Sequence, residues 1–138
     1  MSVRVFTLIF GIFYTLVGIL GFIPGLLSTP PGGMGVTVDS LYGLLLGLFP
    51  VNILHSIVHL LIGIWGILAY RSFDASKAFN KINAIIFAVL TVMGLIPGLD
   101  TTFGLIPLYG ADVWLHALTT LATAYFGYVA PADRPAEV

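Results

Sequence analysis

The chain has 138 residues, of which 59% are hydrophobic and only 8% are charged, and its mean hydropathy is +1.08. Soluble domains carry about 25% charged residues, so this chain has too few charges to cover a water-facing surface, and we predict an integral membrane protein. The net charge is -1 without any Lys/Arg cluster, so no nucleic-acid partner is expected. The absence of cysteine excludes disulfides, thiolate metal sites and catalytic thiols.

Four apolar runs are long enough to cross a bilayer core, which takes about 20 helical residues. Stretches rich in Pro and Gly, or in charge, separate these runs, and such stretches interrupt membrane helices. The predicted spans of this single domain, residues 1–138, are about 4–26, 51–70, 80–98 and 112–130. The breaks fall at 28–33, 71–77 and 98–112.

Two shorter segments complete the predicted layout. Residues 39–49 predict a short helix that lies in the membrane interface, because Asp39 or Ser40 can cap it and its length is too small to span. Residues 131–138 predict a flexible tail. The first apolar run is longer than the signal-peptide core of about 7–15 residues, so we expect it to belong to the fold.

Positive charge lies on one side of this four-span arrangement. All five basic residues fall on that side: Arg4, Arg71, Lys77, Lys81 and Arg134. The other side carries only acidic residues, namely Asp39, Asp100 and Asp112. The positive-inside rule therefore predicts a multi-pass protein of a bacterial plasma (inner) or internal membrane, with both termini in the cytoplasm.

The sequence repeats itself weakly. "GFIPGL" at 21–26 matches "GLIPGL" at 94–99, and "YGLLLGLFPVNILH" at 42–55 matches "FGLIPLYGADVWLH" at 103–116. The repeat predicts a two-helix unit used twice, with the copies parallel and related by a pseudo-twofold axis along the membrane normal. The predicted fold class is thus all-α, an up-down-up-down four-helix bundle. In this scheme His55 and His116 are equivalent, whereas His59 corresponds to Thr120 and Asn52 to Val113.

Polar and small residues recur on one face of each span. In the second span they are Asn52, His55, Ser56, His59, Gly63 and Gly66, and in the fourth Asp112, His116, Thr119, Thr120, Thr123 and Gly127. Because such residues collect between membrane helices, we expect these faces to point inward. The helical rise places His55 about 8 Å and His59 about 14 Å into the span. The three histidines therefore form a layer in the outer half of the bundle.

Three functions are open for this layer. The first is structural, in which Asn52, Ser56, Thr119 and Thr120 join the histidines in holding the helices together. The second is ligation, because His55 and His59 are spaced i, i+4 and His116 with Asp112 could complete a zinc, copper or iron site. Alternatively, His55 and His116 could bind opposite faces of a haem or ligate a chlorin. The third is transport or proton relay, which would require an oligomer.

Catalytic constellations are missing from the sequence. Ser56 lies beside His55, but no third acid on that helix orients a triad. We also find no phosphate-binding glycine loop and no paired membrane carboxylates. The prediction therefore leans toward a protein that is not an enzyme.

The elements "NILHSIVHLLIGIWG" and "GADVWLHALTTL" each start a span after an outer loop. In this the chain resembles a family of small bacterial four-helix membrane proteins known as a domain of unknown function, number four-three-eight-three, over residues 5–130. The family's second motif reads Asn-Trp-Leu-His, whereas Val113 stands at the asparagine position here. The resemblance implies the fold and the matching histidines, and it implies no activity, cofactor or substrate.

The small size of the bundle leads to a functional expectation. We expect a non-enzymatic accessory or structural subunit of a larger membrane complex, in contact with lipid and with a membrane-protein partner or a second copy. The alternative is a stand-alone metal-, haem- or chlorin-binding protein with a redox or metal-handling role. An oligomeric transporter or channel is the third choice.

Overall fold

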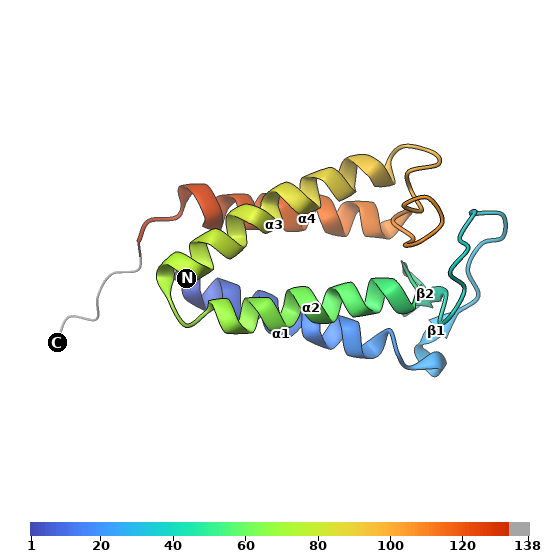
Figure 1. The fold of residues 1–138 in the computed structure, drawn as a ribbon, viewed down its shortest axis with the longest axis horizontal. Helices are drawn as coiled ribbons and strands as arrows, with labels where there is room; N and C mark the ends of the chain where they lie inside the picture. The colour runs from blue at the N-terminus through green and yellow to red at the C-terminus, as the bar shows by residue number, and fades with distance from the viewer. Residues whose placement is uncertain (133–138) are drawn as a thin grey trace.

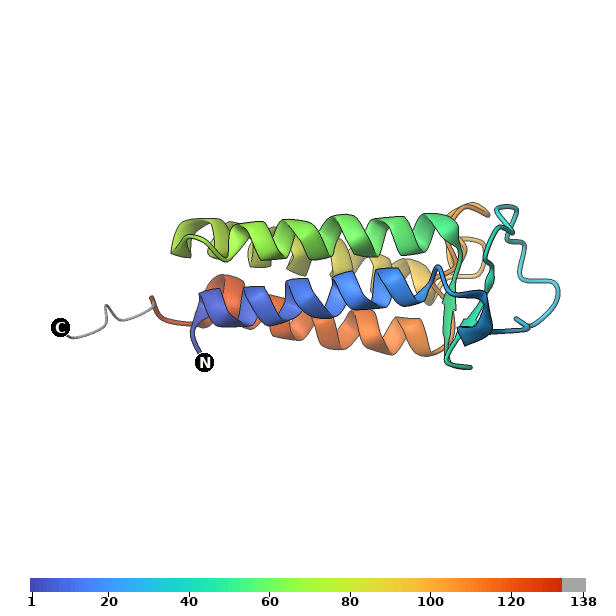
Figure 2. The same cartoon turned by 90° about the horizontal axis from the view of Figure 1, so that it is seen from below.

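The computed structural model describes residues 1–132, so Arg134 and most of the predicted tail lie outside the described residues. Within that range the chain is mostly helical, and the prediction of four helices is confirmed. They are α1 (Val3–Leu20), α2 (Ile53–Ala69), α3 (Phe73–Gly94) and α4 (Ala111–Ala124), and α4 continues into the π-helix η2 (Tyr125–Val129). The helices lie side by side along the long axis, and consecutive helices run in opposite directions (Figures 1 and 2).

The helices differ in length and in apolar character. Within the described residues, α1 and α3 are long and apolar enough to cross a membrane. The apolar helix α2 is shorter, at 17 residues, because the chain before it is extended rather than helical. The N-terminus, the α2–α3 connection and the end of η2 lie at one end of the molecule, which we call the inner end, and the two long loops lie at the other, the outer end (Figure 1).

Helix α3 begins earlier than the predicted third span. The Ser72 hydroxyl accepts a hydrogen bond from the Ala75 amide at 3.1 Å, and Asp74 lies in the first turn, where a negative charge favours the helix N-terminus. The prediction of a break through residues 71–77 is therefore wrong beyond Ser72. Charged side chains there extend from the first turns of α3, and polarity alone does not end a helix that is well capped.

The outer end of the first hairpin differs from the prediction. Helix α1 ends at Leu20 rather than near residue 26, and the 3₁₀-helix η1 (Pro24–Leu26) follows. A small antiparallel sheet then forms in the order β1–β2–β3, from β1 (Leu27–Ser28), β2 (Gly43–Leu45) and β3 (Phe49–Val51). The fold is therefore mostly, not entirely, helical.

The predicted interfacial helix at 39–49 is wrong, because these residues supply β2 and the turn into β3. Leu46 has φ 54° and Gly47 φ 75°, which is turn geometry incompatible with a continuing helix. Leu45 pairs with Phe49 across this turn. The leucine-rich composition of the segment indicated burial correctly, but the two positive-φ positions determine the hairpin.

The centre of the molecule is aromatic. Phe10 and Tyr14 of α1 stack with ring centroids 4.4 Å apart, and Phe79 and Phe87 of α3 meet Phe10 edge-on at 5.5 and 6.2 Å. These four side chains and Ala69 of α2 form the buried apolar core. The core therefore joins the α1–α2 hairpin to α3.

Candidate metal centre

The three histidines come together at the outer end of the helices. His55 and His59 lie in the first two turns of α2, and His116 lies in the second turn of α4. One ring nitrogen from each histidine lies within 4.8 Å of the others, and all three side chains are buried. The ring centroids of His55 and His59 are 4.3 Å apart, and those of His55 and His116 are 6.2 Å apart. The predicted inward-facing layer thus forms a single cluster.

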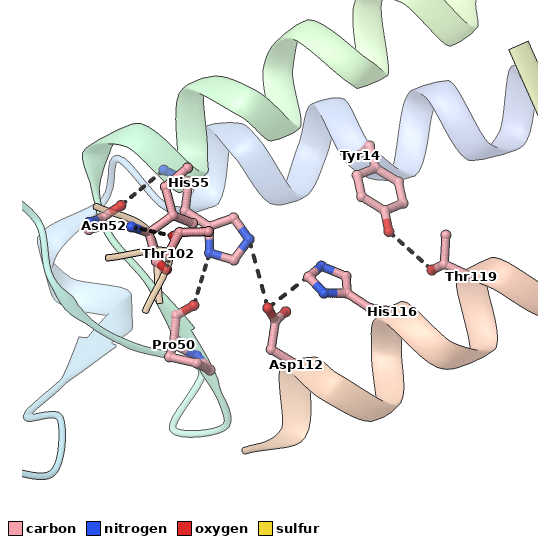
Figure 3. Close-up of polar contacts among 9 residues, drawn as sticks. Tyr14, Pro50, Asn52, His55, Thr102, Asp112, His116 and Thr119 are labelled. Atoms are coloured by element: carbon pink, nitrogen blue, oxygen red, sulfur yellow. Dashed lines mark hydrogen bonds and ion pairs between the residues drawn. The ribbon is translucent and has the colours of Figure 1, made fainter. Parts of the chain in front are cut away.

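Asp112 places a carboxylate between two of these rings (Figure 3). Its Oδ2 atom lies 3.6 Å from Nε2 of His116 and 3.9 Å from Nε2 of His55. Both separations exceed hydrogen-bond length, and this buried oxygen has no partner within the described residues. The structure therefore brings together all four residues of the predicted ligand set.

The ring of His55 is oriented by the backbone. Its Nδ1 lies 3.1 Å from the carbonyl oxygen of Pro50, and since a carbonyl only accepts, Nδ1 carries the proton. The Nε2 lone pair is then free and faces Asp112 (Figure 3). A histidine that ligates a metal through one nitrogen commonly donates its other N–H to a backbone carbonyl or carboxylate, which fixes its tautomer. His55 has this arrangement.

Asn52 fixes the start of α2 and connects the two long loops. Its side-chain oxygen accepts from the amide of His55 at 3.0 Å and caps the helix. Its amide nitrogen donates to the carbonyls of Val38 at 3.0 Å and Leu105 at 2.7 Å. One buried side chain therefore holds a loop from each hairpin against the helix that carries His55.

The remaining residues of the predicted structural layer differ in their burial and in their hydrogen bonds. Thr119 is buried and hydrogen-bonds the Tyr14 hydroxyl at 3.1 Å, which joins the two hairpins. Thr120 is half-buried, and its hydroxyl bonds only the His116 carbonyl of its own helix, at 2.9 Å. Ser56 is buried, but its hydroxyl has no partner within the described residues. Only Thr119 thus makes the interhelical side-chain contact expected of a structural layer.

Tyr14 and the Pro50 carbonyl are two parts of the site that the sequence did not reveal. The Tyr14 ring packs edge-on against His59 with centroids 5.3 Å apart, beside its bond to Thr119. Its position between Gly11 and Gly18 on the small-residue face of α1 could have indicated burial. No sequence signal identifies a backbone carbonyl as the partner of a particular histidine.

Two cavities border the cluster. One of about 70 Å³ lies between α2, α3 and the second long loop, and His55, His59 and His116 line it together with apolar side chains. The other, of about 190 Å³, lies between α1, the β2–β3 hairpin and α4, and reaches His59 and Asp112. The polar cluster therefore separates two spaces whose other walls are almost entirely apolar.

Known proteins give one match. A family model described as Domain of unknown function (DUF4383) matches residues 4–129. No curated protein and no solved structure matches the chain. The match includes α1 from its second residue, the other three helices and every residue of the histidine cluster. The chain therefore belongs to the family described as Domain of unknown function (DUF4383).

Proposed function

We propose that this chain is a four-span membrane protein that binds one first-row transition-metal ion between its two helical hairpins. The ligands are His55, His59, His116 and Asp112. The observation that carries the proposal is the convergence of three buried histidine nitrogens within 4.8 Å of one another, with an unpartnered carboxylate oxygen 3.9 and 3.6 Å from Nε2 of His55 and His116. Imidazole with a carboxylate is a donor set that zinc, copper and iron accept.

Exposed apolar side chains support a membrane setting. Every helix carries large apolar residues that are mostly exposed, for example Leu16, Leu61, Ile85 and Leu121. A surface with this many exposed apolar side chains is unfavourable in water and favourable in lipid. On this proposal the molecule is an up-down-up-down bundle whose outward faces meet acyl chains.

The basic residues support an orientation. Arg4, Arg71, Lys77 and Lys81 lie toward the inner end, where the N-terminus and the α2–α3 connection are found (Figure 1). Lys77 donates to the Ala130 carbonyl at 2.6 Å, which ties the start of α3 to the end of η2. The positive-inside rule then places this end in the cytoplasm and the histidine cluster in the opposite half of the bilayer.

Glycines at matching repeat positions support a duplicated hairpin. Gly66 and Gly127 are equivalent in the sequence repeat, and each approaches another helix closely. A Cβ added at Gly66 would lie 2.9 Å from Gly11 Cα, and one added at Gly127 would lie 2.8 Å from the Lys81 amide nitrogen. The equivalent histidines, His55 and His116, likewise lie near the outer starts of α2 and α4.

Unpartnered polar atoms favour ligation over a structural layer. Asp112 Oδ2, His59 Nδ1 and His116 Nδ1 are buried and lack hydrogen-bond partners within the described residues. Helix-joining polar residues normally satisfy one another, because an unpartnered buried group costs about 1–3 kcal/mol. A metal ion between Asp112 and Nε2 of His55 and His116 would supply the missing partner of the carboxylate.

Cavity size favours an ion over a tetrapyrrole. Ligands of drug size occupy pockets of about 300–1,000 Å³, and the space beside the three histidines is about 70 Å³. That space suits an ion and a water molecule. A tetrahedral ion with bonds of about 2.0–2.1 Å needs its ligand atoms roughly 3.4 Å apart, so the present spacing closes by an ångström or so on binding.

Zinc binding to the purified protein tests the proposal. The protein is purified in mild detergent, stripped with EDTA and titrated with Zn²⁺ by calorimetry and with Co²⁺ by visible absorption. We expect one ion per chain, with tetrahedral Co²⁺ bands that are lost in His55→Ala and His116→Ala. Thr120→Val is the matched control, because the Thr120 hydroxyl bonds the backbone carbonyl of His116 and no histidine ring among the described residues. An absence of stoichiometric binding, or binding that survives in the His55→Ala/His116→Ala double variant, would contradict the proposal.

The same preparation addresses the two other functions. An accessory subunit would co-purify with larger membrane proteins and would be metal-free as isolated. A transporter would form homo-oligomers and support flux in liposomes. A monomer that binds zinc and shows no flux is the outcome that our proposal expects.

A further inference from the structure

The inner end of the molecule carries an excess of positive charge. Its basic residues, which we call the inner cations, lie at the start of α1, in the α2–α3 connection and in the first three turns of α3: Arg4, Arg71, Lys77 and Lys81. Asp74 is the single acidic residue that the structure describes at this end. The described part of the chain therefore gives the inner end a positive net charge, which a negatively charged partner would complement.

Two of the inner cations lie over exposed tyrosine rings. The Cζ atom of Arg4 is 5.4 Å from the centroid of the Tyr70 ring, and Nζ of Lys81 is 5.6 Å from that of Tyr128. Both tyrosines are exposed. Tyrosine rings collect at the boundary between lipid and water, and long basic side chains extend along apolar surface to place their charge there. The pairs therefore have the chemistry of a headgroup layer.

The inner cations also adjoin the exposed apolar surface. Leu68 lies one turn before Arg71, and Ile82 follows Lys81 directly, and both apolar side chains are exposed. Arg71 and Lys81 are themselves exposed and form no ion pair with an acidic side chain of the described residues. A phospholipid has the matching arrangement, a phosphate above acyl chains. A free phosphate ion would meet the charges and leave the apolar surface unused.

We propose that the inner end binds anionic phospholipids in preference to zwitterionic ones, with the phosphate at Arg71 and Lys81 and the acyl chains along Leu68 and Ile82. A zwitterionic headgroup carries its own cation beside the phosphate, so its attraction to a basic side chain is weaker. Each basic residue near an anionic lipid surface strengthens association about fivefold. The preference rests on the membrane setting proposed above and is independent of the metal ion.

The two tryptophans of the chain are a matched pair of reporters. Trp65 lies in the last two turns of α2, toward Arg71, and is 37% exposed, whereas Trp114 lies at the outer start of α4 and is 74% exposed. Trp114→Phe leaves the inner reporter, and Trp65→Phe leaves the outer one. Each variant is reconstituted with EDTA in phosphatidylcholine vesicles that contain brominated phosphatidylglycerol or brominated phosphatidylcholine. Bromine quenches tryptophan fluorescence on contact, so the quenching gives the relative association of the two lipids.

We expect phosphatidylglycerol to associate about fivefold more strongly than phosphatidylcholine at Trp65 and equally at Trp114. In the Trp114→Phe background, Arg71→Gln/Lys81→Gln should bring the ratio at Trp65 below about two, because two cations are lost. The matched control, Arg71→Lys/Lys81→Arg, keeps both charges and should keep the ratio. An excess of soluble glycerol phosphate, which has the phosphate without acyl chains, should leave the ratio unchanged.

Three results would overturn the proposal. They are equal quenching of Trp65 by the two lipids, a preference that survives in the folded Arg71→Gln/Lys81→Gln protein, and displacement of the brominated lipid by glycerol phosphate. If neither lipid quenches either tryptophan, the membrane setting is refuted and this preference with it. Equal quenching by both lipids refutes the preference alone. Since EDTA is present throughout, a failure of zinc binding does not affect any of these results.

Discussion

The two helical hairpins are packed in different ways. In the α1–α2 hairpin, glycines bring the backbones together along much of the interface. A Cβ added at Gly11 would lie 2.6 Å from the Ile67 amide nitrogen, and one added at Gly63 would lie 2.3 Å from the Thr15 hydroxyl. At Gly18 it would lie 2.8 Å from the Leu60 side chain. The helices of this hairpin therefore have no room to approach further.

The α3–α4 hairpin has such contacts only near its two ends. A Cβ at Gly94 would lie 2.6 Å from the Leu108 carbonyl, and one at Gly127 would lie 2.8 Å from the Lys81 amide nitrogen. Between them, alanine and threonine side chains, including Ala88 and Ala117, line a hollow on the outer surface. The first hairpin thus holds His55 and His59 on a fixed support, and in the proposed metal site it is α4 that would move to close the cluster around the ion.

The largest expected effect comes from breaking the glycine interface. Gly63→Ala places a methyl group against Thr15 and the Gly11 carbonyl, and we expect it to lower the free energy of unfolding by about 3 kcal/mol. The measurement is reversible unfolding in mixed micelles titrated with SDS.

Two controls accompany this variant. Gly25→Ala adds its methyl group in open space, and Ala88→Val adds bulk beside the hollow of the second hairpin. Both should stay within about 0.5 kcal/mol of the parent. If Ala88→Val lowers the free energy of unfolding as much as Gly63→Ala does, the two hairpins do not differ in packing.

The second effect concerns Asn52 and Val113, which are equivalent positions in the proposed repeat. Asn52→Ala removes the α2 cap and leaves the carbonyls of Val38 and Leu105 without this donor, so we expect a loss of about 2–3 kcal/mol in unfolding free energy. Val113→Ala removes two buried methyl groups and should cost about 1–1.5 kcal/mol. Hydrogen exchange of the loop amides is the second readout. If both variants lose the same unfolding free energy and the hydrogen exchange of the loop amides is unchanged, Asn52 does not hold the loops together.

A smaller effect is expected for the contact between the hairpins. Tyr14→Phe and Thr119→Val each remove one side of the 3.1 Å hydrogen bond, and a double-mutant cycle should give a coupling of about 0.6 kcal/mol. Thr120→Val replaces Thr119→Val in the control cycle and should give no coupling. A coupling energy equal to that of the control cycle would show that this hydrogen bond does not stabilise the contact between the hairpins.

The smallest effect is a pH dependence at the outer loops. The hydroxyls of Tyr42 and Tyr109, one from each long loop, are 2.7 Å apart, and burial raises the pKa of Tyr109. Because the folded pKa lies above the unfolded value of about 10, this contribution is present below pH 10 and is lost as the pH rises above it. Tyr109→Phe should therefore lessen the fall in melting temperature between pH 9 and 11. An identical pH profile for the variant would contradict the assignment.

The sequence predicted the helices and their buried faces well, because small and polar residues at helical spacing report burial directly. His55, His59, His116 and Asp112 were identified for this reason, and the structure places them together. The outer end was predicted poorly. Residues 39–49 were predicted to form a short interfacial helix, yet a positive φ at Leu46, a non-glycine residue, marks a turn that composition does not reveal.

The contacts made by backbone carbonyls also could not be predicted from the sequence. The carbonyl of Pro50 orients His55, and the carbonyls of Val38 and Leu105 hold Asn52. Any residue type can present a carbonyl, so these partners follow from the path of the loops alone. The sequence indicated that Asn52 was buried but gave no reason why its repeat equivalent should be valine.

The clamp at Asn52 makes the two halves of the molecule unequal. One side chain of the first hairpin holds the long loops of both halves, whereas position 113 carries a buried valine that packs against the end of α3. The halves are therefore not interchangeable: a chimaera that carries two copies of the second hairpin would have two copies of its long loop and no Asn52 to join them.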